Sequence, residues 1–247
     1  MLTSRVFTNP SGERLDFTFH PNARRDMLVI LGHGLTGNKD RPLLVALAEG
    51  LNARGWPCVR ISYSGNGESQ GKFEDATIEK EVADLKAILD SIPDWVNVCY
   101  VGHSMGAAVG VTTAAEDLRI QLLVSLAGMV HPAPFFEREF GHLTPGKDCM
   151  WEEEVHPLSE AFAISMKGLP SVLPSAAKVT QPWLLIHGTA DDLVPIEDSR
   201  DAHAAAVCQK KLVEIPGAGH SFDETSYPQV IDEVDAWLSA RFGACAQ

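Results

Sequence analysis

Short apolar segments that alternate with helical segments constrain the fold of this chain more than any other feature of its sequence. The apolar segments lie at 27–34, 56–65, 96–102, 121–128, 182–188 and 210–219. Apolar residues at helical spacing lie between them at 42–55 and 78–92, and again near the end of the chain at 230–238. Continuous apolar strands are typical of sheets that are covered on both faces. The pattern therefore predicts an α/β fold with a mostly parallel central sheet and helices on both faces.

Two segments depart from this alternation. The segment 5–20 has Asn9-Pro10-Ser11-Gly12 at its middle and predicts a hairpin. The segment 131–181 has no strong strand but contains aromatic residues that need burial. Because insertions of this length in compact domains usually carry their own structure or function, we expect an inserted cap over the active site. The predicted division is a core of residues 1–130 and 182–247, with the cap at 131–181.

Chemically active residues follow several of the predicted strands. In open α/β sheets, ligands bind beyond the carboxyl ends of the strands, so the residues at these ends are the most informative. The segments that follow the apolar runs are Gly32-His33-Gly34-Leu35, Gly102-His103-Ser104-Met105-Gly106, His187-Gly188-Thr189-Ala190-Asp191-Asp192 and Pro216-Gly217-Ala218-Gly219-His220. A serine, an acid and a histidine thus lie at three separate strand ends, where the fold can bring them together.

These three residue types are those that nucleophilic catalysis by serine requires. A serine hydroxyl is a weak nucleophile until a base removes its proton, and histidine is the suitable base at neutral pH. A carboxylate then orients the histidine and stabilises its charged form. The residues predict Ser104 as nucleophile, His220 as base and Asp191 as the acid. Asp192 is the local alternative to Asp191; we expect it to face solvent or to cap a helix that begins near Ile196.

The remaining histidines are expected to have structural roles. His33 and His103 flank the predicted site and are expected to support turns, and His187 is expected to pack at a strand end. The histidines that show no metal-ligand spacing are His20, His131, His142, His156 and His203. We therefore expect no metal and no cofactor.

Taken together, these motifs resemble the α/β-hydrolase fold over nearly the whole chain. The segments that carry the resemblance are Gly102-x-Ser104-x-Gly106, His33-Gly34, His187-Gly188-x-x-Asp191-x-x-Val194-Pro195 and Gly219-His220. The resemblance implies a serine hydrolase with Ser104, His220 and Asp191 as its triad. It also implies an oxyanion hole formed by the backbone N–H groups of Leu35 and Met105.

Within that fold, the chain resembles the small intracellular carboxylesterases related to feruloyl (cinnamoyl) esterases. Their Gly-x-Gly-x-Ser segment corresponds to Gly65-Asn66-Gly67-Glu68-Ser69, and the cap is similar in size and position. That family often has an acidic residue where Ser62 stands and a histidine where Asn66 stands. These two departures concern substrate preference more than the chemistry, because neither is a triad position.

The predicted function is hydrolysis of a small-molecule carboxylic ester through an acyl-enzyme on Ser104. Thioesterase, aminopeptidase or other amide hydrolase activity uses the same triad and stays open as an alternative, as does carbon–carbon bond hydrolysis. A further alternative is a non-catalytic ligand receptor, because fold alone does not prove activity. The cap aromatics Phe135, Phe136, Trp151 and Phe162 are the expected apolar walls of the substrate pocket.

Charge and cysteine content narrow the expected partners and compartment. The formal net charge of −13 would repel nucleic acid and anionic lipid, so we expect neither a nucleic-acid nor a membrane partner. The five cysteines are an odd number without a Cys-x-x-Cys motif, which favours a reducing compartment. The N-terminal segment does not read as a signal peptide, so we expect a cytoplasmic protein. The sequence leaves the oligomeric state open.

Overall fold

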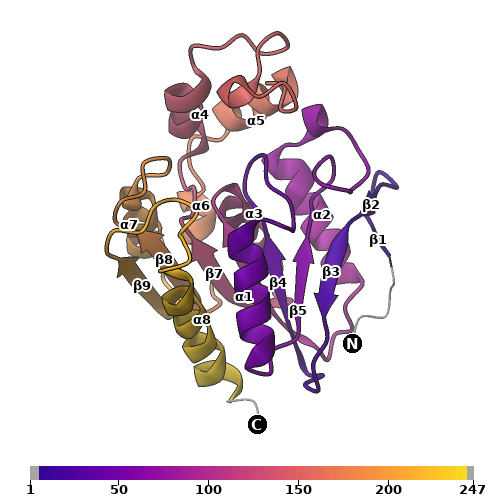
Figure 1. The fold of residues 1–247 in the computed structure, drawn as a ribbon, viewed down its shortest axis with the longest axis vertical. Helices are drawn as coiled ribbons and strands as arrows, with labels where there is room; N and C mark the ends of the chain where they lie inside the picture. The colour runs from indigo at the N-terminus through magenta and orange to yellow at the C-terminus, as the bar shows by residue number, and fades with distance from the viewer. Residues whose placement is uncertain (1–5, 244–247) are drawn as a thin grey trace.

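A computed structural model describes residues 6–243 and contains a seven-stranded sheet in the order β3-β5-β4-β6-β7-β8-β9 (Figure 1). The strands are β3 (Phe17–His20), β4 (Met27–Gly32), β5 (Cys58–Ile61), β6 (Asn97–His103), β7 (Ile120–Leu126), β8 (Trp183–Gly188) and β9 (Lys210–Ile215). β3 runs antiparallel to β5, and the other neighbouring pairs are parallel. The predicted mostly parallel sheet is confirmed. Arg5 of the predicted hairpin segment and Cys245 lie outside the described residues.

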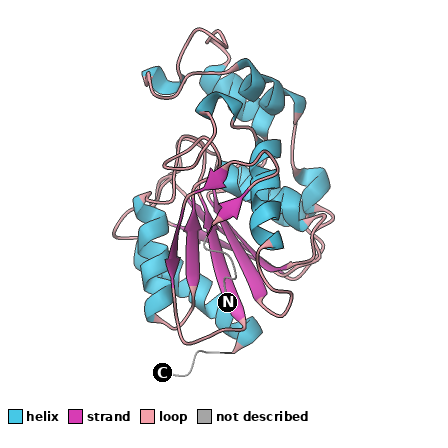
Figure 2. Ribbon diagram, turned by 90° about the vertical axis from the view of Figure 1, so that its right-hand side faces the viewer, coloured by secondary structure: helices cyan, strands magenta, loops and turns pink. Residues whose placement is uncertain are grey.

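Helices cover both faces of the sheet (Figure 2). The helices of the predicted core are α1 (Pro42–Ala53), α2 (Ile78–Asp90), α3 (Met105–Ala114), α7 (Ile196–Ala205) and α8 (Tyr227–Phe242). Side chains of β4 alternate between the two cores: Leu28 and Ile30 pack with α2 and α3, whereas Val29 and Leu31 pack with α1 and α8. This alternation follows from the pleat of a strand, and it explains why β4 is apolar at every position.

A helix cap and the predicted hairpin are formed in the structure. Thr77 caps α2 by accepting a hydrogen bond at its hydroxyl from the Lys80 backbone N–H, at 3.2 Å. β1 (Phe7–Thr8) and β2 (Arg14–Leu15) form an antiparallel hairpin around the predicted turn. The hairpin is short because the chain leaves it after Leu15 and joins the main sheet as β3.

The segment 131–181 forms helices and no strand within its described residues. It contains α4 (Pro132–Phe140), the 3-10 turn η2 (Met150–Glu152), α5 (Glu160–Gly168) and α6 (Leu173–Ala176). Figure 1 shows α4 and α5 standing above the sheet, whereas α6 lies lower and packs against α7. Phe136, Phe140 and Phe162 are buried against one another, with ring centroids 5.9–6.3 Å apart. They give α4 and α5 a small apolar core of their own.

Within residues 6–243, no helix has the combination of length and apolar character that a bilayer crossing requires.

Candidate active site

Ser104 occupies the whole connection between β6, which ends at His103, and α3, which begins at Met105. Its φ of 55° and ψ of −120° are strained for a residue with a side chain. Backbone contacts hold this conformation: the Ser104 N–H donates to the Leu126 carbonyl at 2.9 Å, and the Ser104 carbonyl accepts from the Met129 N–H at 3.1 Å. Strain of this kind at a strand-to-helix turn is the geometry of a nucleophile elbow.

Two glycines allow the His33-Gly34 turn to pack directly against the Ser104 turn. A Cβ atom on Gly34 would lie 2.7 Å from Ser104 Cβ, and one on Gly106 would lie 2.4 Å from the His33 carbonyl oxygen. Neither space admits a larger residue without movement of the backbone. This close approach places Leu35, the next residue of the turn, near the start of α3. The N–H of Met105, the first residue of that helix, has no acceptor within the helix.

Asp191 lies against His220, and its side chain is fully buried. His220 Nδ1 donates to Asp191 Oδ2 at 2.8 Å, and the Asp191 side chain has no exposed surface. Asp191 Oδ1 accepts the backbone N–H groups of Leu193 at 3.0 Å and Val194 at 2.9 Å. Burial raises the pKa of the Asp191 carboxyl, but contacts with His187 and His220 outweigh this and hold that pKa well below its ordinary value. Asp191 is therefore a fixed carboxylate that orients the His220 ring.

His187 on β8 is the other histidine beside Asp191. Its Nε2 lies 3.0 Å from the Val194 carbonyl oxygen and 3.1 Å from Asp191 Oδ2. Its Nδ1 lies 2.7 Å from the hydroxyl of Ser199 on α7. The sequence predicts only that His187 packs at a strand end; the polar contact with Asp191 is missed. A signal was present, because His187 precedes Asp191 by four residues in the same motif.

His103 connects the Ser104 turn to the loop of His220. Its Nε2 donates to the His220 carbonyl at 2.9 Å, and the two imidazole rings lie 4.9 Å apart between centroids. Burial and the neighbouring His220 lower the pKa of His103 to about 3. The His103 ring is therefore neutral at physiological pH and supports the loop that carries His220.

His33 supports the turn that precedes Leu35. Its Nδ1 donates to the Gly34 carbonyl at 2.8 Å, and its Nε2 accepts the Tyr63 backbone N–H at 3.0 Å. Because the Tyr63 N–H can only donate, His33 carries its proton on Nδ1 and is neutral in this arrangement. Burial lowers the pKa of His33 to about 4. Both His33 and His103 contact backbone groups, as their predicted role in turns requires.

The neutral His33 predicts a loss of stability in acid. In the unfolded chain His33 takes up a proton near pH 6.5, whereas in the folded protein it does so only near pH 4. The contribution of the neutral His33 to the free energy of unfolding is thus fully present above about pH 6.5. As the pH falls from about 6.5 to about 4, it decreases by about 1.4 kcal/mol per pH unit. Urea unfolding of wild type and His33→Gln from pH 7 to pH 4 measures it. The variant should lose less stability on acidification; equal slopes would contradict this assignment.

Three of the candidate residues lie at a cavity of about 710 Å³, whereas Asp191 and Met105 do not line it. Its volume is in the range of small-molecule sites. Ser104, His220 and Leu35 line it, and no hydrogen bond joins the side chains of Ser104 and His220 within residues 6–243. Catalytic hydrogen bonds are often long in the absence of substrate. Other side chains that line the cavity include Arg41, Phe135, Glu139, Trp151, Glu153 and Asp192.

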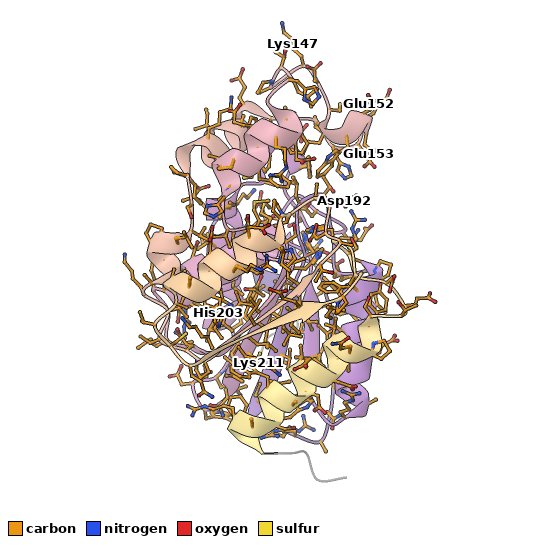
Figure 3. The ribbon with its side chains drawn as sticks, turned by 90° about the vertical axis from the view of Figure 1, so that its left-hand side faces the viewer. Lys147, Glu152, Glu153, Asp192, His203 and Lys211 are labelled. Atoms are coloured by element: carbon orange, nitrogen blue, oxygen red, sulfur yellow. The ribbon has the colours of Figure 1, made fainter. Side chains whose placement is uncertain are left out.

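The structure separates Asp192 from Asp191. Asp192 is exposed at the cavity rim, on the same side of the molecule as Glu153 (Figure 3). The predicted alternative that Asp192 caps the helix near Ile196 is wrong. α7 does begin at Ile196, but its N-cap is Pro195, without a side-chain hydrogen bond. The reason is that the backbone of the Asp191 turn is already held by the Asp191 carboxylate, which leaves Asp192 directed outward.

The cavity also differs from prediction in its walls. Phe135 and Trp151 line it, but Phe136 and Phe162 are buried in the apolar core of α4 and α5 and do not. Ser62 and Asn66, the two departures from the resembled esterases, are buried outside the cavity lining. Side-chain burial within residues 131–181 depends on how the helices of this segment pack together, which the sequence pattern does not reveal.

The sequence matches the profile of the "Alpha/beta hydrolase family" over residues 28–233. Among curated relatives, the human "Palmitoyl-protein thioesterase ABHD10, mitochondrial" is 31% identical over 170 residues, which cover 61% of this chain and 52% of that protein. "Esterase LipQ" of Mycobacterium tuberculosis is 26% identical over 226 residues, which cover 82% of this chain and 52% of that protein. The chain thus spans about half the length of these curated relatives.

Among solved structures, Est1E from Butyrivibrio proteoclasticus with bound ferulic acid superposes on this chain with a TM-score of 0.84. The two sequences are 25% identical, and the match covers 96% of this chain and 99% of that one. The similarity therefore extends through the segment 131–181 as well as the sheet.

Proposed function

Because the chain belongs to the alpha/beta hydrolase family, we propose that it is a serine hydrolase that cleaves carboxylic esters through an acyl-enzyme on Ser104. One arrangement carries this proposal. The strained Ser104 and the imidazole of His220 line the same cavity, while Asp191 holds the far side of that imidazole at 2.8 Å. Esterases among the relatives and a feruloyl-binding structural neighbour support the bond type.

In the proposed reaction each residue has one role. Ser104 Oγ attacks the ester carbonyl carbon while His220 takes the hydroxyl proton, and the carbonyl electron pair moves onto the oxygen. The tetrahedral intermediate then collapses, the bond to the alcohol oxygen breaks, and His220 returns the proton to the leaving alcohol. Water repeats these steps on the acyl-enzyme and releases the acid. Asp191 stabilises the charged His220 ring in each half of the cycle.

The backbone N–H groups of Leu35 and Met105 are the proposed oxyanion hole. Leu35 follows the turn that packs against Ser104, and Met105 opens α3, so both belong to segments fixed by glycine contacts. A single donor of this kind is worth about 3–4 kcal/mol of transition-state stabilisation. Their side chains take no part in the chemistry, but the Leu35 side chain lies in the cavity wall.

Thioester hydrolysis is the second candidate. The observation in its favour is the 31% identity to a protein named as a palmitoyl-protein thioesterase. The charged cavity rim, with Arg41, Glu139, Glu153 and Asp192, favours a short or aromatic acyl group over a long alkyl chain. A small-molecule ester is therefore the proposed substrate. The buried free thiols of Cys58 and Cys99 fit a reducing compartment, which supports the proposed cytoplasmic location.

A matched substrate series tests the proposed function. Acetyl, butyryl and cinnamoyl groups would be offered as p-nitrophenyl esters, as thioesters and as anilides, with wild type and Ser104→Ala compared throughout. We expect the largest kcat/KM for the esters, and we expect it to depend on Ser104. A larger kcat/KM for the thioesters would favour the second candidate. Negligible turnover of every substrate would indicate a ligand receptor and overturn the proposal.

We also propose that residues 131–181 act as a cap that sets substrate preference. Arg138 on α4 donates to the Leu193 carbonyl at 2.6 Å, which ties the cap to the turn that follows Asp191. Trp151 lines the cavity and keeps 38% of its surface exposed, so the substrate can contact its indole ring. Its backbone has a positive φ of 49°, a strain that is common at ligand sites.

The role of Trp151 gives a prediction on specificity. Trp151→Ala should lower kcat/KM for cinnamoyl esters relative to acetyl esters by about fivefold, because an aromatic contact is worth about 1 kcal/mol. Phe162→Leu is the matched control, since Phe162 is buried in the cap and does not line the cavity. It should lower the melting temperature and leave the ratio unchanged. An unaltered ratio in Trp151→Ala would limit the cap to a structural role.

A further inference from the structure

We propose that His187 and Ser199 form a positioning pair that fixes the Asp191 carboxylate and sets the proton affinity of the site. This inference rests on the proposed function, because it concerns how the acid acts on His220. His187 lies at the end of β8 and Ser199 in the first turns of α7. The pair therefore connects the sheet, the Asp191 turn and the following helix.

Both oxygens of the Asp191 carboxylate have contacts with N–H groups. Oδ1 accepts two backbone N–H groups, and Oδ2 lies 2.8 Å from His220 Nδ1 and 3.1 Å from His187 Nε2. Three N–H groups thus donate to an anion that offers about four lone-pair directions. The His187 Nε2–H, whose hydrogen bond is to the Val194 carbonyl, lies beside the same anion, and the Asp191 side chain has no exposed surface. Removal of any one of these N–H groups leaves a buried carboxylate short of a partner, which costs more than the loss of an ordinary hydrogen bond.

The surroundings of His187 determine which of its ring nitrogens carries the proton. Nε2 faces two oxygens, the Val194 carbonyl at 3.0 Å and Asp191 Oδ2 at 3.1 Å. A lone pair on Nε2 would point at two acceptors, so this nitrogen carries a hydrogen. In the neutral ring Nδ1 then accepts a hydrogen bond from the Ser199 hydroxyl at 2.7 Å. His187 and Ser199 are both buried, so no water replaces either partner.

His187 also acts electrostatically on Asp191 Oδ2, the oxygen that lies near both histidines. The positive end of the His187 N–H dipole lies close to Asp191 Oδ2, the same oxygen that accepts the hydrogen bond from His220. It withdraws part of the negative charge that would otherwise act on the His220 ring. Without His187, this carboxylate oxygen would favour the protonated His220 more strongly, and the base would become available only at higher pH. A positively charged His187 would, like the N–H dipole, weaken the pull of Asp191 on the proton of His220.

Other charged groups near the pair leave this reading intact. The ionisable groups that face His187, His220 or their loops are Asp198 beside Ser199, Glu214 opposite His187 on β9, His103 beside His220, and Asp192, Glu139, Glu153 and Arg41 at the cavity. Asp198 is bonded to the backbone N–H groups of Val130 and His131, and Glu214 is paired with Arg200. None of these groups contacts Asp191 Oδ2, whose contacts are with His187 and His220.

The pH dependence of kcat/KM tests the pair. His187→Leu removes the N–H group, and the acid limb of the profile should move upward by about half a pH unit, with a lower plateau. His187→Gln keeps an amide N–H within reach and should restore most of the wild-type position. His203→Leu is the matched control, because His203 lies on α7 away from Asp192 (Figure 3) and has no contact with Asp191. It should leave the acid limb in place.

The outcomes separate this inference from the proposed function. A His187→Leu protein that keeps the wild-type acid limb, or a His187→Gln protein that shows no rescue, would overturn the positioning role while Ser104-dependent hydrolysis by wild type still stood. If His187→Leu does not fold, Ser199→Ala decides, because His187→Gln is expected to resemble wild type. Ser199→Ala leaves Nδ1 without its donor and should move the limb in the same direction. An unmoved limb in Ser199→Ala would then count against the pair.

Discussion

Replacement of Ser104 with alanine is expected to lower kcat for ester hydrolysis by a factor of about 10⁴–10⁶, because loss of a triad nucleophile typically costs this much. The backbone turn should survive the change, since its strain is held by hydrogen bonds of the Ser104 N–H and carbonyl and not by the hydroxyl. The residual rate comes from binding and from the oxyanion donors. Steady-state kinetics with p-nitrophenyl butyrate measures the loss.

Ser239→Ala supplies the control for this variant. It makes the same chemical change on α8, outside the cavity lining. Its kcat should equal that of wild type, and all three proteins should unfold at similar temperatures. Activity of Ser104→Ala within tenfold of wild type would rule out Ser104 as the nucleophile.

The second large effect is expected at Asp191. Asp191→Asn should lower kcat by about 10³–10⁴, because the amide neither stabilises a charged imidazole nor enforces the correct tautomer. The structure shows why the amide cannot adapt. Oδ1 accepts two backbone N–H groups, so the amide oxygen must take that place and the NH₂ group must face His220 Nδ1. His220 would then carry its proton on Nε2, where the base needs a lone pair.

Asp192→Asn is the neighbouring control for Asp191→Asn. Asp192 is exposed at the cavity rim, and surface substitutions usually change the free energy of unfolding by about 0.5 kcal/mol or less. Because the hydrogen bond to His220 comes from Asp191 and not from Asp192, kcat should change by less than about threefold. Both variants are measured under the same conditions with the same ester. If Asp192→Asn loses activity and Asp191→Asn does not, the acid is misplaced by one residue. If both retain activity, the acid lies elsewhere.

The sequence predicts most of the sheet because buried parallel strands are continuous apolar segments that are easy to recognise. β4 and β6 are apolar at nearly every position, since both of their faces are covered. Their carboxyl ends are equally readable, because the residue after each run lies at one edge of the sheet. This is how Ser104, Asp191 and His220 are brought to the same edge of the sheet, beyond β6, β8 and β9, from distant parts of the sequence.

What the sequence does not predict depends on packing between segments. The burial of Phe136 and Phe162 depends on how α4 and α5 meet, and that contact has no periodic signature. The contact between His187 and Asp191 depends on the tight turn that returns Val194 to the end of β8. Apolar spacing reports which residues face a core, whereas it carries no record of which polar groups are paired within it.

Labelling with a fluorophosphonate tests the central claim most directly, because the reagent forms a stable bond only with an activated serine. The protein would be labelled at neutral pH, digested, and the modified residue identified by mass spectrometry, with Ser104→Ala and Asp191→Asn treated in parallel. The account predicts one modified residue, Ser104, with no labelling of Ser104→Ala and slow labelling of Asp191→Asn. Labelling of a different serine, or no labelling of the wild-type protein, would contradict it.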